Sequence, residues 1–496
     1  MKTISKPTLQ VAGFIAAFLL VGPVSLAIAA GITIGNGASV TLSGLPTVTT
    51  VDLTISGTLS GGGGTINVKG NWTNSNTFTS GTGTVAFNGT GTQNINSGGI
   101  TDDKDFYNLA FLGSTTIVPV TNDIKINSNL TLSNTATLSN TNNKSFSIAG
   151  NVQVASGNTW SKGTGTITLA GTSGTQTINF AGKSVEDIVI DALGATKQFT
   201  GSVTTDSFSA TNGTLDFNGQ SITSSGNFTI GVGSQVIADA DAMNGADINV
   251  GGNLNLDGEN GDKLAFNWTS AWSIDVANDA DMDYISFNTS NTNAMTLTVS
   301  GANATASYTD VEYSDASGGT TIDATDGTNI NNGNNPNWQF NIISVTLRDS
   351  NDTADYATWV LGSGKDLDTV YIMNNTECVL VKNNGNIAED FSISAVGTSW
   401  TLSNATGLDT AVLMGLFNGN SAPSTGDFST IGDLISGTTV WSTYQGDGSG
   451  KYQGTGDGDN VAASSGEKLY IYLKTPSSLT QGSQESITVT VGCREH

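Results

Sequence analysis

Short stretches of the chain alternate apolar residues with threonine, serine or asparagine. Examples are "LTISGTL" from Leu53, "TINVKGNW" from Thr65 and "GTVAFNG" from Gly83. Strict alternation gives a strand one buried face and one solvated face. Glycine and asparagine separate these stretches, and both residues tolerate the positive φ of tight turns. The pattern therefore predicts many short β-strands, and it contains no helical period.

A longer repeat organises these strands. The segment that begins at Gly70, "GNWTNSNTFTSGTGTVAF", returns at Gly150 as "GNVQVASGNTWSKGTGTITL". A period near eighty residues holds three or four coils of a smaller unit, and the turns come every six to ten residues. Such a repeat predicts a parallel β-helix over residues 31–340, with its apolar residues stacked into one narrow core. A row of small β-sandwich modules is the alternative.

The pattern of the sequence changes after Phe340, where the repeat ends. Residues 341–496 contain seven or so longer alternating stretches, among them "CVLVKNNGNIAEDFSISAV" and "KLYIYLK", separated by turn-rich segments. Longer strands without a repeat are typical of an antiparallel β-sandwich. The sequence thus predicts an all-β protein in which a parallel β-helix precedes an immunoglobulin-like β-sandwich.

Parts of the sequence resemble secreted bacterial right-handed parallel β-helix proteins of the adhesin or surface type. The resemblance lies in the units "GNxTx" and "GTGTVxFNGTGxQxI" and in the closing run "YTDVEYSDASGGTTIDATDGTNINNGNNPNWQF", Tyr308 to Phe340. In addition, "NNGNIAEDFSIS", Asn383 to Ser394, is similar to hairpins of immunoglobulin-like modules in bacterial surface proteins. The resemblance implies an extended rod at a cell surface, and it implies no enzymatic activity.

Residues 1–30 have the pattern of a signal peptide. Lys2 and Lys6 precede an apolar run, and small residues follow it, so cleavage is expected after Ala29 or Ala30. A retained membrane anchor is the alternative, but two glycines and a proline interrupt the segment. No later stretch is apolar for long enough to cross a bilayer. The expected mature protein is therefore secreted or held at a cell surface, without a transmembrane segment.

The charge of the chain narrows the choice of partners. The formal net charge is −25, from 42 acidic and 17 basic residues, and removal of the leader lysines makes it more negative still. Nucleic acid is not an expected partner, because its binding depends on lysine and arginine neutralising phosphates. Anionic membranes and acidic polysaccharides are disfavoured unless a divalent cation bridges the charges. The expected partners are glycans or other surface proteins, including further copies of this chain.

The residues that most enzymes need are scarce. His496 is the single histidine, and Arg348 and Arg494 are the only arginines. Ser/His/Asp hydrolysis, a Cys/His nucleophile and histidine metal sites are therefore not expected. The β-helix lyases resemble one another in using arginine or lysine as base beside calcium-binding acidic residues, and the pectin hydrolases in a "GHG" and an "RIK" motif. Neither motif occurs in this sequence. No catalytic residue is predicted, His496 and the scattered lysines are expected to be solvated, and the protein is predicted not to be an enzyme.

Two other functions remain open. One is a calcium-dependent carbohydrate-active β-helix, lyase or hydrolase-like, that works through paired carboxylates. The other is carbohydrate binding by the sandwich, residues 341–496. Trp72 and Trp160 occupy matching places in the repeat, which indicates core or corner positions more than a platform for sugars.

One acidic segment is a candidate metal site. Alternation places Asp279, Asp281 and Asp283 on one face of a strand, where a hard cation with oxygen ligands would relieve their repulsion. Calcium is the predicted ion, although Tyr284 stands where a calcium loop needs glycine. An exposed acidic strand and a catalytic pair are the alternatives. The loop Gln445–Asn460, with Asp447, Asp457 and Asp459, is a weaker oxygen-rich candidate.

Both cysteines lie after residue 340, Cys378 at the head of one strand and Cys493 at the end of the last. In an exported domain an even pair predicts a disulfide, whose role would be to pin the terminal strand. Two free thiols are the alternative, and neither arrangement implies redox chemistry.

Overall fold

The computed structural model describes residues 9–11, 18–20, 25–27, 31–43, 47–236, 243–289, 292–419, 421–446, 448–482 and 485–496, with side chains from residue 31 onward. The chain divides into two compact units, Met1–Phe340 and Asn341–His496. Among the described residues there is no helix with the length and apolar character needed to cross a bilayer.

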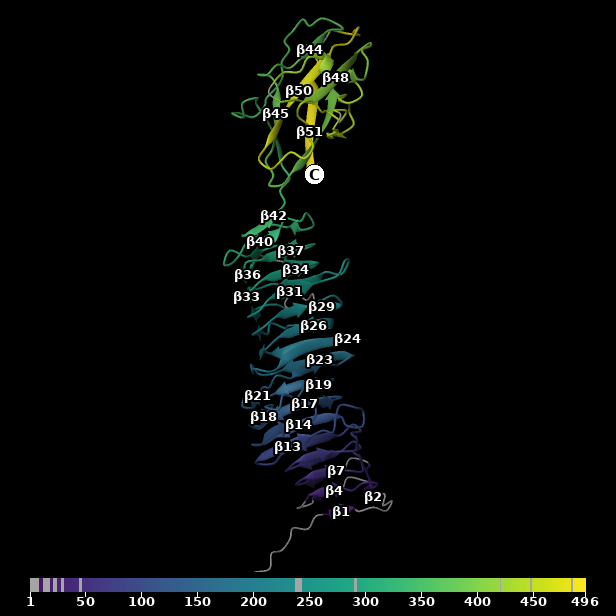
Figure 1. The fold of residues 1–496 in the computed structure, drawn as a ribbon, viewed down its shortest axis with the longest axis vertical. Helices are drawn as coiled ribbons and strands as arrows, with labels where there is room; N and C mark the ends of the chain where they lie inside the picture. Colours follow the sequence, from purple (N-terminus) through teal and green to yellow (C-terminus); the bar gives the residue numbers. More distant parts are fainter. Residues whose placement is uncertain are drawn as a thin grey trace, which may run out of the picture. The chain divides into compact units, whose positions relative to one another are not determined.

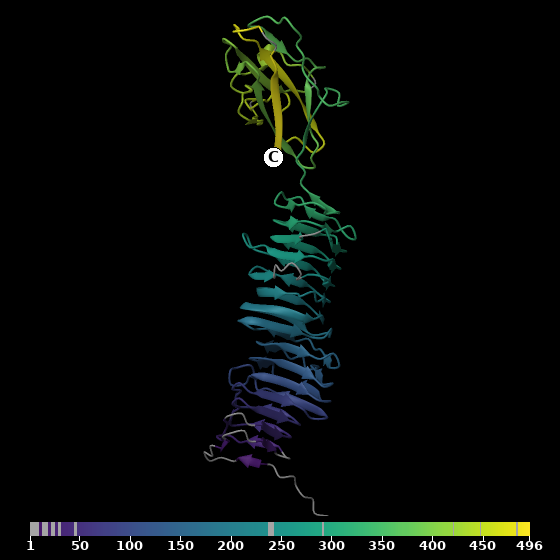
Figure 2. The same cartoon turned by 180° about the vertical axis from the view of Figure 1, so that it is seen from behind.

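The first unit is a parallel β-solenoid of about 14 turns. Its strands, β1 to β42, stack coil upon coil (Figure 1), and the view from behind shows the same stacking (Figure 2). The strand ladders of the described residues in this unit are all parallel, for example Leu53–Ile55 with Trp72–Asn74. This confirms the predicted β-helix against a row of sandwich modules, which would need antiparallel pairs.

Five sheets make up the solenoid. An eight-stranded sheet consists of β1 (Leu9–Val11), β4 (Ile32–Ile34), β7 (Leu53–Ile55), β10 (Trp72–Asn74), β13 (Thr92–Asn96), β15 (Thr116–Pro119), β18 (Thr137–Ser139) and β21 (Thr159–Ser161). A four-stranded sheet consists of β2 (Phe18–Leu20), β5 (Ser39–Leu42), β8 (Thr58–Ser60) and β11 (Thr77–Thr79).

The later coils contribute two further small sheets. A six-stranded sheet consists of β25 (Val203–Thr205), β27 (Ile222–Ser224), β30 (Asp247–Val250), β33 (Ser273–Val276), β36 (Met295–Val299) and β39 (Ser314–Asp315). A four-stranded sheet consists of β32 (Leu264–Trp268), β35 (Ile285–Thr289), β38 (Asp310–Val311) and β41 (Ile330–Asn331).

The remaining solenoid strands join into one long sheet. They are β3 (Ser25–Ala27), β6 (Thr47–Thr50), β9 (Thr65–Val68), β12 (Thr84–Phe87), β14 (Asn108–Leu112), β16 (Ile124–Ile126), β17 (Leu130–Ser133), β19 (Phe146–Ile148), β20 (Val152–Val154), β22 (Thr166–Leu169), β23 (Gly174–Asn179), β24 (Asp187–Gly201), β26 (Phe208–Asp216), β28 (Phe228–Ile230), β29 (Ser234–Val236), β31 (Leu254–Asp257), β34 (Ala280–Asp283), β37 (Ala304–Ser307), β40 (Ile322–Ala324) and β42 (Trp338–Phe340).

The register gives the length of a coil. Phe208 pairs with Phe228, 20 positions on, and Phe228 pairs with Leu254, 26 positions on. Four pairing steps lead from β10, which holds Trp72, to β21, which holds Trp160. These four coils span the 88 residues from Trp72 to Trp160, about 22 residues each, so the sequence period near eighty residues comprises between three and four coils, within the predicted range.

One apolar core runs through the described coils of the solenoid, from Ile34 to Trp338. Alternation along each strand builds it, as in β7, where Leu53 and Ile55 are buried and the residue between them is not. The five tryptophans of the unit are all buried: Trp72, Trp160, Trp268, Trp272 and Trp338. This confirms the interpretation of Trp72 and Trp160 as core residues.

Strands β1, β2 and β3 lie within the predicted signal peptide. Each pairs with a strand of the next coil: β1 with β4, β2 with β5 and β3 with β6. Removal of residues 1–30 would make β4, β5 and β6 the first coil of the remaining chain.

In its described residues the second unit contains two sheets and one 310 helix, η1 (Thr425–Asp427). One sheet has the order β43 (Val345–Arg348), β45 (Val379–Asn383), β50 (Gly466–Lys474), β48 (Thr410–Phe417) and β47 (Thr401–Leu402), with β44 (Val370–Ile372) also beside β50. The other has the order β49 (Val440–Trp441), β46 (Glu389–Gly397) and β51 (Ile487–Glu495). The β47–β48 pair is parallel and the other pairs are antiparallel.

Both sheets of the second unit contribute to one core. Val381 of β45 and Leu469 of β50 come from the first sheet, and Phe391 and Ile393 of β46 come from the second. The all-β class of this unit is as predicted, and its sheets are mixed and antiparallel respectively.

Candidate functional site

The outer faces of the solenoid carry columns of small polar side chains, one from each coil. In the eight-stranded sheet, Thr92, Thr116, Thr137 and Thr159 follow one another in register, and none of the four is buried. Neighbouring strands lie about 4.8 Å apart, so the hydroxyls repeat at that spacing along the sheet. This threonine column is a regular polar surface of the solenoid.

A groove crosses the six-stranded sheet. It has a volume of about 440 Å³ and lies over β27, β30, β33 and β36. A register column of Thr223, Asn249, Asp275 and Thr298 runs along it. Asp275 is the one ionisable side chain among the residues that line the groove. The groove can hydrogen-bond a hydroxylated ligand, but it holds no second carboxylate for hydrolysis.

The predicted calcium ligands lie on β34 and just before it. Asp281 and Asp283 alternate with buried Ala280 and Met282, so the predicted common outer face is present. Each carboxylate binds a polar side chain of the following coil. Asp279 Oδ2 accepts a hydrogen bond from Asn303 Nδ2 at 3.0 Å, Asp281 Oδ1 accepts one from Thr305 Oγ1 at 2.9 Å, and Asp283 Oδ1 accepts one from Ser307 Oγ at 2.6 Å. Calcium binding by these aspartates stays a prediction.

A fourth aspartate, Asp257, lies next to these three on the preceding coil and was not among the predicted calcium ligands. Asp257 of β31 pairs in register with Asp283 of β34 on the next coil. Burial raises the pKa of Asp257, and the charges of Asp283 and Asp281 raise it further. Successive coils differ in length, 20 residues from Phe208 to Phe228 and 26 from Phe228 to Leu254, so no signal in the sequence placed these like charges one above the other.

Tyr284 follows these aspartates at the end of β34. Its φ is 52°, the left-handed conformation for which a calcium loop uses glycine. The residue after Asp283 thus has a left-handed backbone, with a tyrosine in the place of the expected glycine.

One lysine contradicts the expectation that the lysines are solvated. Lys197 of β24 is fully buried, and its Nζ donates to Gly171 O at 2.6 Å. Burial lowers the pKa of this amine. The alternation "ATKQFTG" around it did carry the signal, because Lys197 falls on the inward positions of the strand with Phe199.

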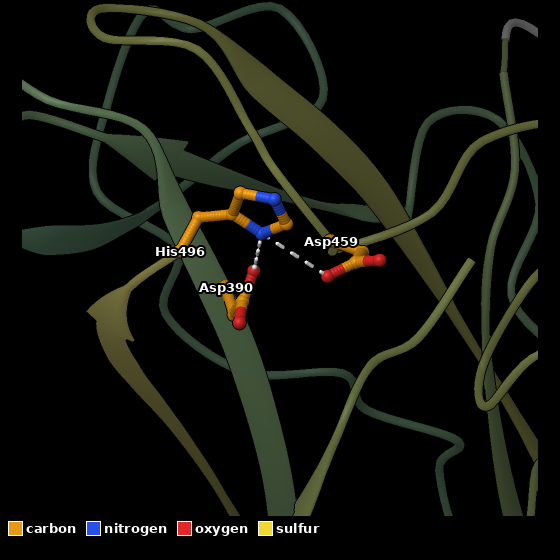
Figure 3. Close-up of side chains that lie close together, drawn as sticks. All are labelled: Asp390, Asp459 and His496. Atoms are coloured by element: carbon orange, nitrogen blue, oxygen red, sulfur yellow. Dashed lines mark hydrogen bonds and ion pairs between the residues drawn. The ribbon is translucent and has the colours of Figure 1, made fainter.

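In the second unit, three ligand-type side chains meet near the last residue. Figure 3 shows His496 beside Asp390 of β46 and Asp459. The His496 Nδ1 lies 2.7 Å from Asp390 Oδ1 and 3.4 Å from Asp459 Oδ1. Arg494 adds its Nε and Nη2, each 3.0 Å from Asp390 Oδ2. We call these four residues the β51 clasp, because two of them belong to or follow β51.

In the β51 clasp, Asp390 and His496 each shift the pKa of the other in the direction that favours the charged form. Burial alone would raise the pKa of Asp390, but hydrogen bonds from His496, the Asn460 N–H and Arg494 outweigh burial and lower it. The hydrogen bond to Asp390 in turn raises the pKa of His496. His496 is exposed, as expected, but its imidazole is also paired with a buried carboxylate.

Three residues of the β51 clasp are of the types that bind metal ions. In the described part of the chain, Asp390, Asp459 and His496 are the group of three metal-ligating side chains whose ligand atoms lie within 4.8 Å of one another. Asp279, Asp281 and Asp283 do not converge in this way. Arg494 and the imidazole already neutralise Asp390, and Arg494 also stacks on Trp441 at 4.4 Å. The arrangement therefore fastens the final strand to β46 through charge pairs.

The oxygen-rich loop Gln445–Asn460 contributes Asp459 to the β51 clasp. Asp457 is half-buried, and burial raises its pKa. Its Oδ1 accepts a hydrogen bond from the Asp459 N–H at 3.1 Å, which shapes the turn. Asp447 lies outside the described residues.

The predicted disulfide between Cys378 and Cys493 is absent, and both thiols are free. Cys378 precedes β45 of one sheet, whereas Cys493 lies on β51 of the other, and the two thiols face different partners. The Cys378 thiol donates to Asn375 O at 3.5 Å, whereas Cys493 lies against Glu389, whose carboxylate raises the pKa of the thiol in addition to burial. The terminal strand is fastened by β-pairing to β46 and by the β51 clasp instead.

No family model matches this chain, and neither a curated protein nor a solved structure matches it. The fold itself places the protein in the class of parallel β-solenoids, followed along the chain by a second all-β unit.

Proposed function

We propose that this chain is an exported, non-enzymatic surface or matrix protein whose solenoid serves as a rod-like spacer, adhesin or assembly subunit. The observation that carries the proposal is the threonine column, together with the polar column of the groove. Identical side chains at a fixed spacing suit repetitive contacts with glycans or with like molecules. The signal-peptide pattern of residues 1–30 supports export.

The absence of enzymatic activity is part of the proposal. The solenoid sequence has neither histidine nor arginine, and its one groove-lining ionisable group is Asp275. Acid-base catalysis of glycoside cleavage needs two carboxyl groups that face one ligand. The buried Lys197 has no access to a substrate.

We also propose an immunoglobulin-like role for the second unit, as a module that accompanies the solenoid at a surface. Its support is the shared core between two sheets and the "NNGN" turn at Asn383. In that turn the Asn383 Oδ1 accepts a hydrogen bond from the Gly385 N–H at 2.7 Å, and its Nδ2 donates to Ile387 O at 2.7 Å.

The test combines binding and turnover on one set of ligands. Full-length protein is incubated with a panel of insoluble polysaccharides, with calcium and with EDTA. Co-sedimentation reports binding, and reducing ends or unsaturated products report cleavage. We expect binding or ordered self-association without product. Product release would overturn the non-enzymatic proposal. A protein that neither binds a polysaccharide nor self-associates would overturn the surface role.

A further inference from the structure

Two tyrosines stack on the outside of the solenoid, on consecutive coils. The rings of Tyr284 and Tyr308 are nearly parallel, at an interplanar angle of 4°, with centroids 4.4 Å apart. Each tyrosine follows the last residue of its strand, β34 or β37, and each has a left-handed φ, 52° and 48°. Bulky residues rarely adopt this conformation, so the backbone holds both rings at the corner at some cost in strain.

The stacked pair is accessible. Tyr308 is 44% exposed, and Tyr284 is partly exposed. On the preceding coil the equivalent position is Gly258, since Asp257 pairs in register with Asp283. Glycine presents no side chain, so none from this position covers the ring face of Tyr284 that is turned away from Tyr308.

Two acidic residues neighbour Tyr284, one in sequence and one on the preceding coil. Asp283 immediately precedes Tyr284, and Asp257 precedes Gly258 one coil earlier. The nearest lysine in sequence, Lys263, is paired with Asp310 at 2.9 Å. Asp257 and Asp283 thus form a stack of like charges, and their mutual repulsion decreases when a cationic ligand binds between or beside them.

We propose that Tyr284, Tyr308, Asp257 and Asp283 form a binding platform for an amino-sugar polymer that bears free ammonium groups. The apolar C–H face of a pyranose packs on an aromatic face, and an ammonium group gains from both the ring and the carboxylates. The net charge of −25 favours a cationic glycan over a neutral or acidic one. This inference rests on the proposed glycan-binding role of the solenoid, for which it names the ligand class.

The test titrates full-length protein by calorimetry with a glucosamine hexasaccharide, its fully N-acetylated form and cellohexaose. We expect the glucosamine oligomer to bind at least tenfold more tightly than the other two, and its affinity to fall as NaCl is raised. Tyr284→Leu and Tyr308→Leu should each lower that affinity about tenfold. Asp283→Asn should lower it for the glucosamine oligomer and leave the acetylated oligomer unchanged.

Two controls keep the result interpretable. Tyr444→Leu removes an exposed tyrosine of the second unit and should change nothing. Circular dichroism of each variant shows whether the solenoid is folded, and Tyr308→Phe tests the site with the ring retained. Equal affinity for all three oligomers, or binding that both Leu variants leave intact, would overturn the platform. Retention on insoluble polysaccharides would then still support the proposed function. Loss of oligomer binding together with loss of this retention would overturn the platform and the proposed function alike.

Discussion

At the scale of single residues, buried or paired charges decide where the protein responds to pH. His496 illustrates this, since its imidazole contacts the buried Asp390, which also holds Arg494. The sequence could not show this pairing, because the three residues come together only when β51 pairs with β46. The free thiols Cys378 and Cys493 make the same point, because spacing along the chain does not reveal which side chains face each other.

Replacing His496 should alter the pH dependence of stability in the second unit. The pKa of His496 is raised in the folded state, so its stabilisation is complete below the unfolded value of about 6.5 and is lost as pH rises through the folded pKa. We expect His496→Gln to lower the unfolding free energy by roughly 0.5 kcal/mol at pH 5.5, and by nothing at pH 9. Chemical denaturation at both pH values measures this. An equal loss at both would contradict the assigned pairing.

Lys197 should behave in the opposite way. Burial lowers its pKa, so the unfolded chain binds the proton more tightly and stability rises as pH approaches the unfolded value of about 10.4. Lys197→Met should stabilise the solenoid by about 1 kcal/mol at pH 7, and the gain should shrink by pH 10. The exposed Lys69→Met is the matched control in the same denaturation series. A destabilised Lys197→Met at pH 7 would show that the bond to Gly171 outweighs the cost of burying the amine.

At the scale of elements, each copy of the long repeat places one buried glutamine in the same hydrogen-bonding role. Gln93 of β13 donates its Nε2 to Val68 O at 2.9 Å and to Gly70 O at 2.7 Å, and it accepts from the Gly89 N–H at 2.9 Å. Gln176 of β23 makes the equivalent bonds to Ile148 O, Gly150 O and the Gly171 N–H. The repeated segments therefore encode the same internal bracing of the turn, once in each copy of the repeat.

Loss of this bracing should cost more than loss of an exposed neighbour. Gln93→Ala leaves buried backbone groups without a partner, so we expect the unfolding free energy to fall by about 2 kcal/mol. Thr92→Ala on the outer face of the same strand should change it by less than about 0.5 kcal/mol. Urea denaturation of the two variants compares them. Equal effects would mean that Gln93 does not brace the turn.

Alternation and turn spacing were sufficient to predict the solenoid strands. The inward positions of β7 followed directly from period-two patterning, and the burial of Trp72 and Trp160 followed from their places in the long repeat. Register between coils was not predictable, because coil lengths vary from 20 to 26 residues in the neighbouring steps of Phe208, Phe228 and Leu254. The stacking of Asp257 on Asp283, and of Tyr284 on Tyr308, therefore became visible only in three dimensions.

At the scale of the whole molecule, the two units have separate cores. Calorimetry of the full chain should therefore show two transitions. The His496→Gln substitution should shift one of them at pH 5.5 and leave the other in place. A single transition that moves as a whole would contradict independent units.

The central claim is that the regular polar faces of the solenoid carry its contacts. The most direct test introduces Thr116→Glu and Thr137→Glu singly and together. Each variant is then co-sedimented with the polysaccharide that retains the wild-type protein, or with its own assemblies if the wild-type protein self-associates. Both positions lie in the threonine column and are not buried, so the fold should survive. We predict a stepwise loss of retention, greatest in the double variant. Undiminished retention in a folded double variant would contradict the claim for this face.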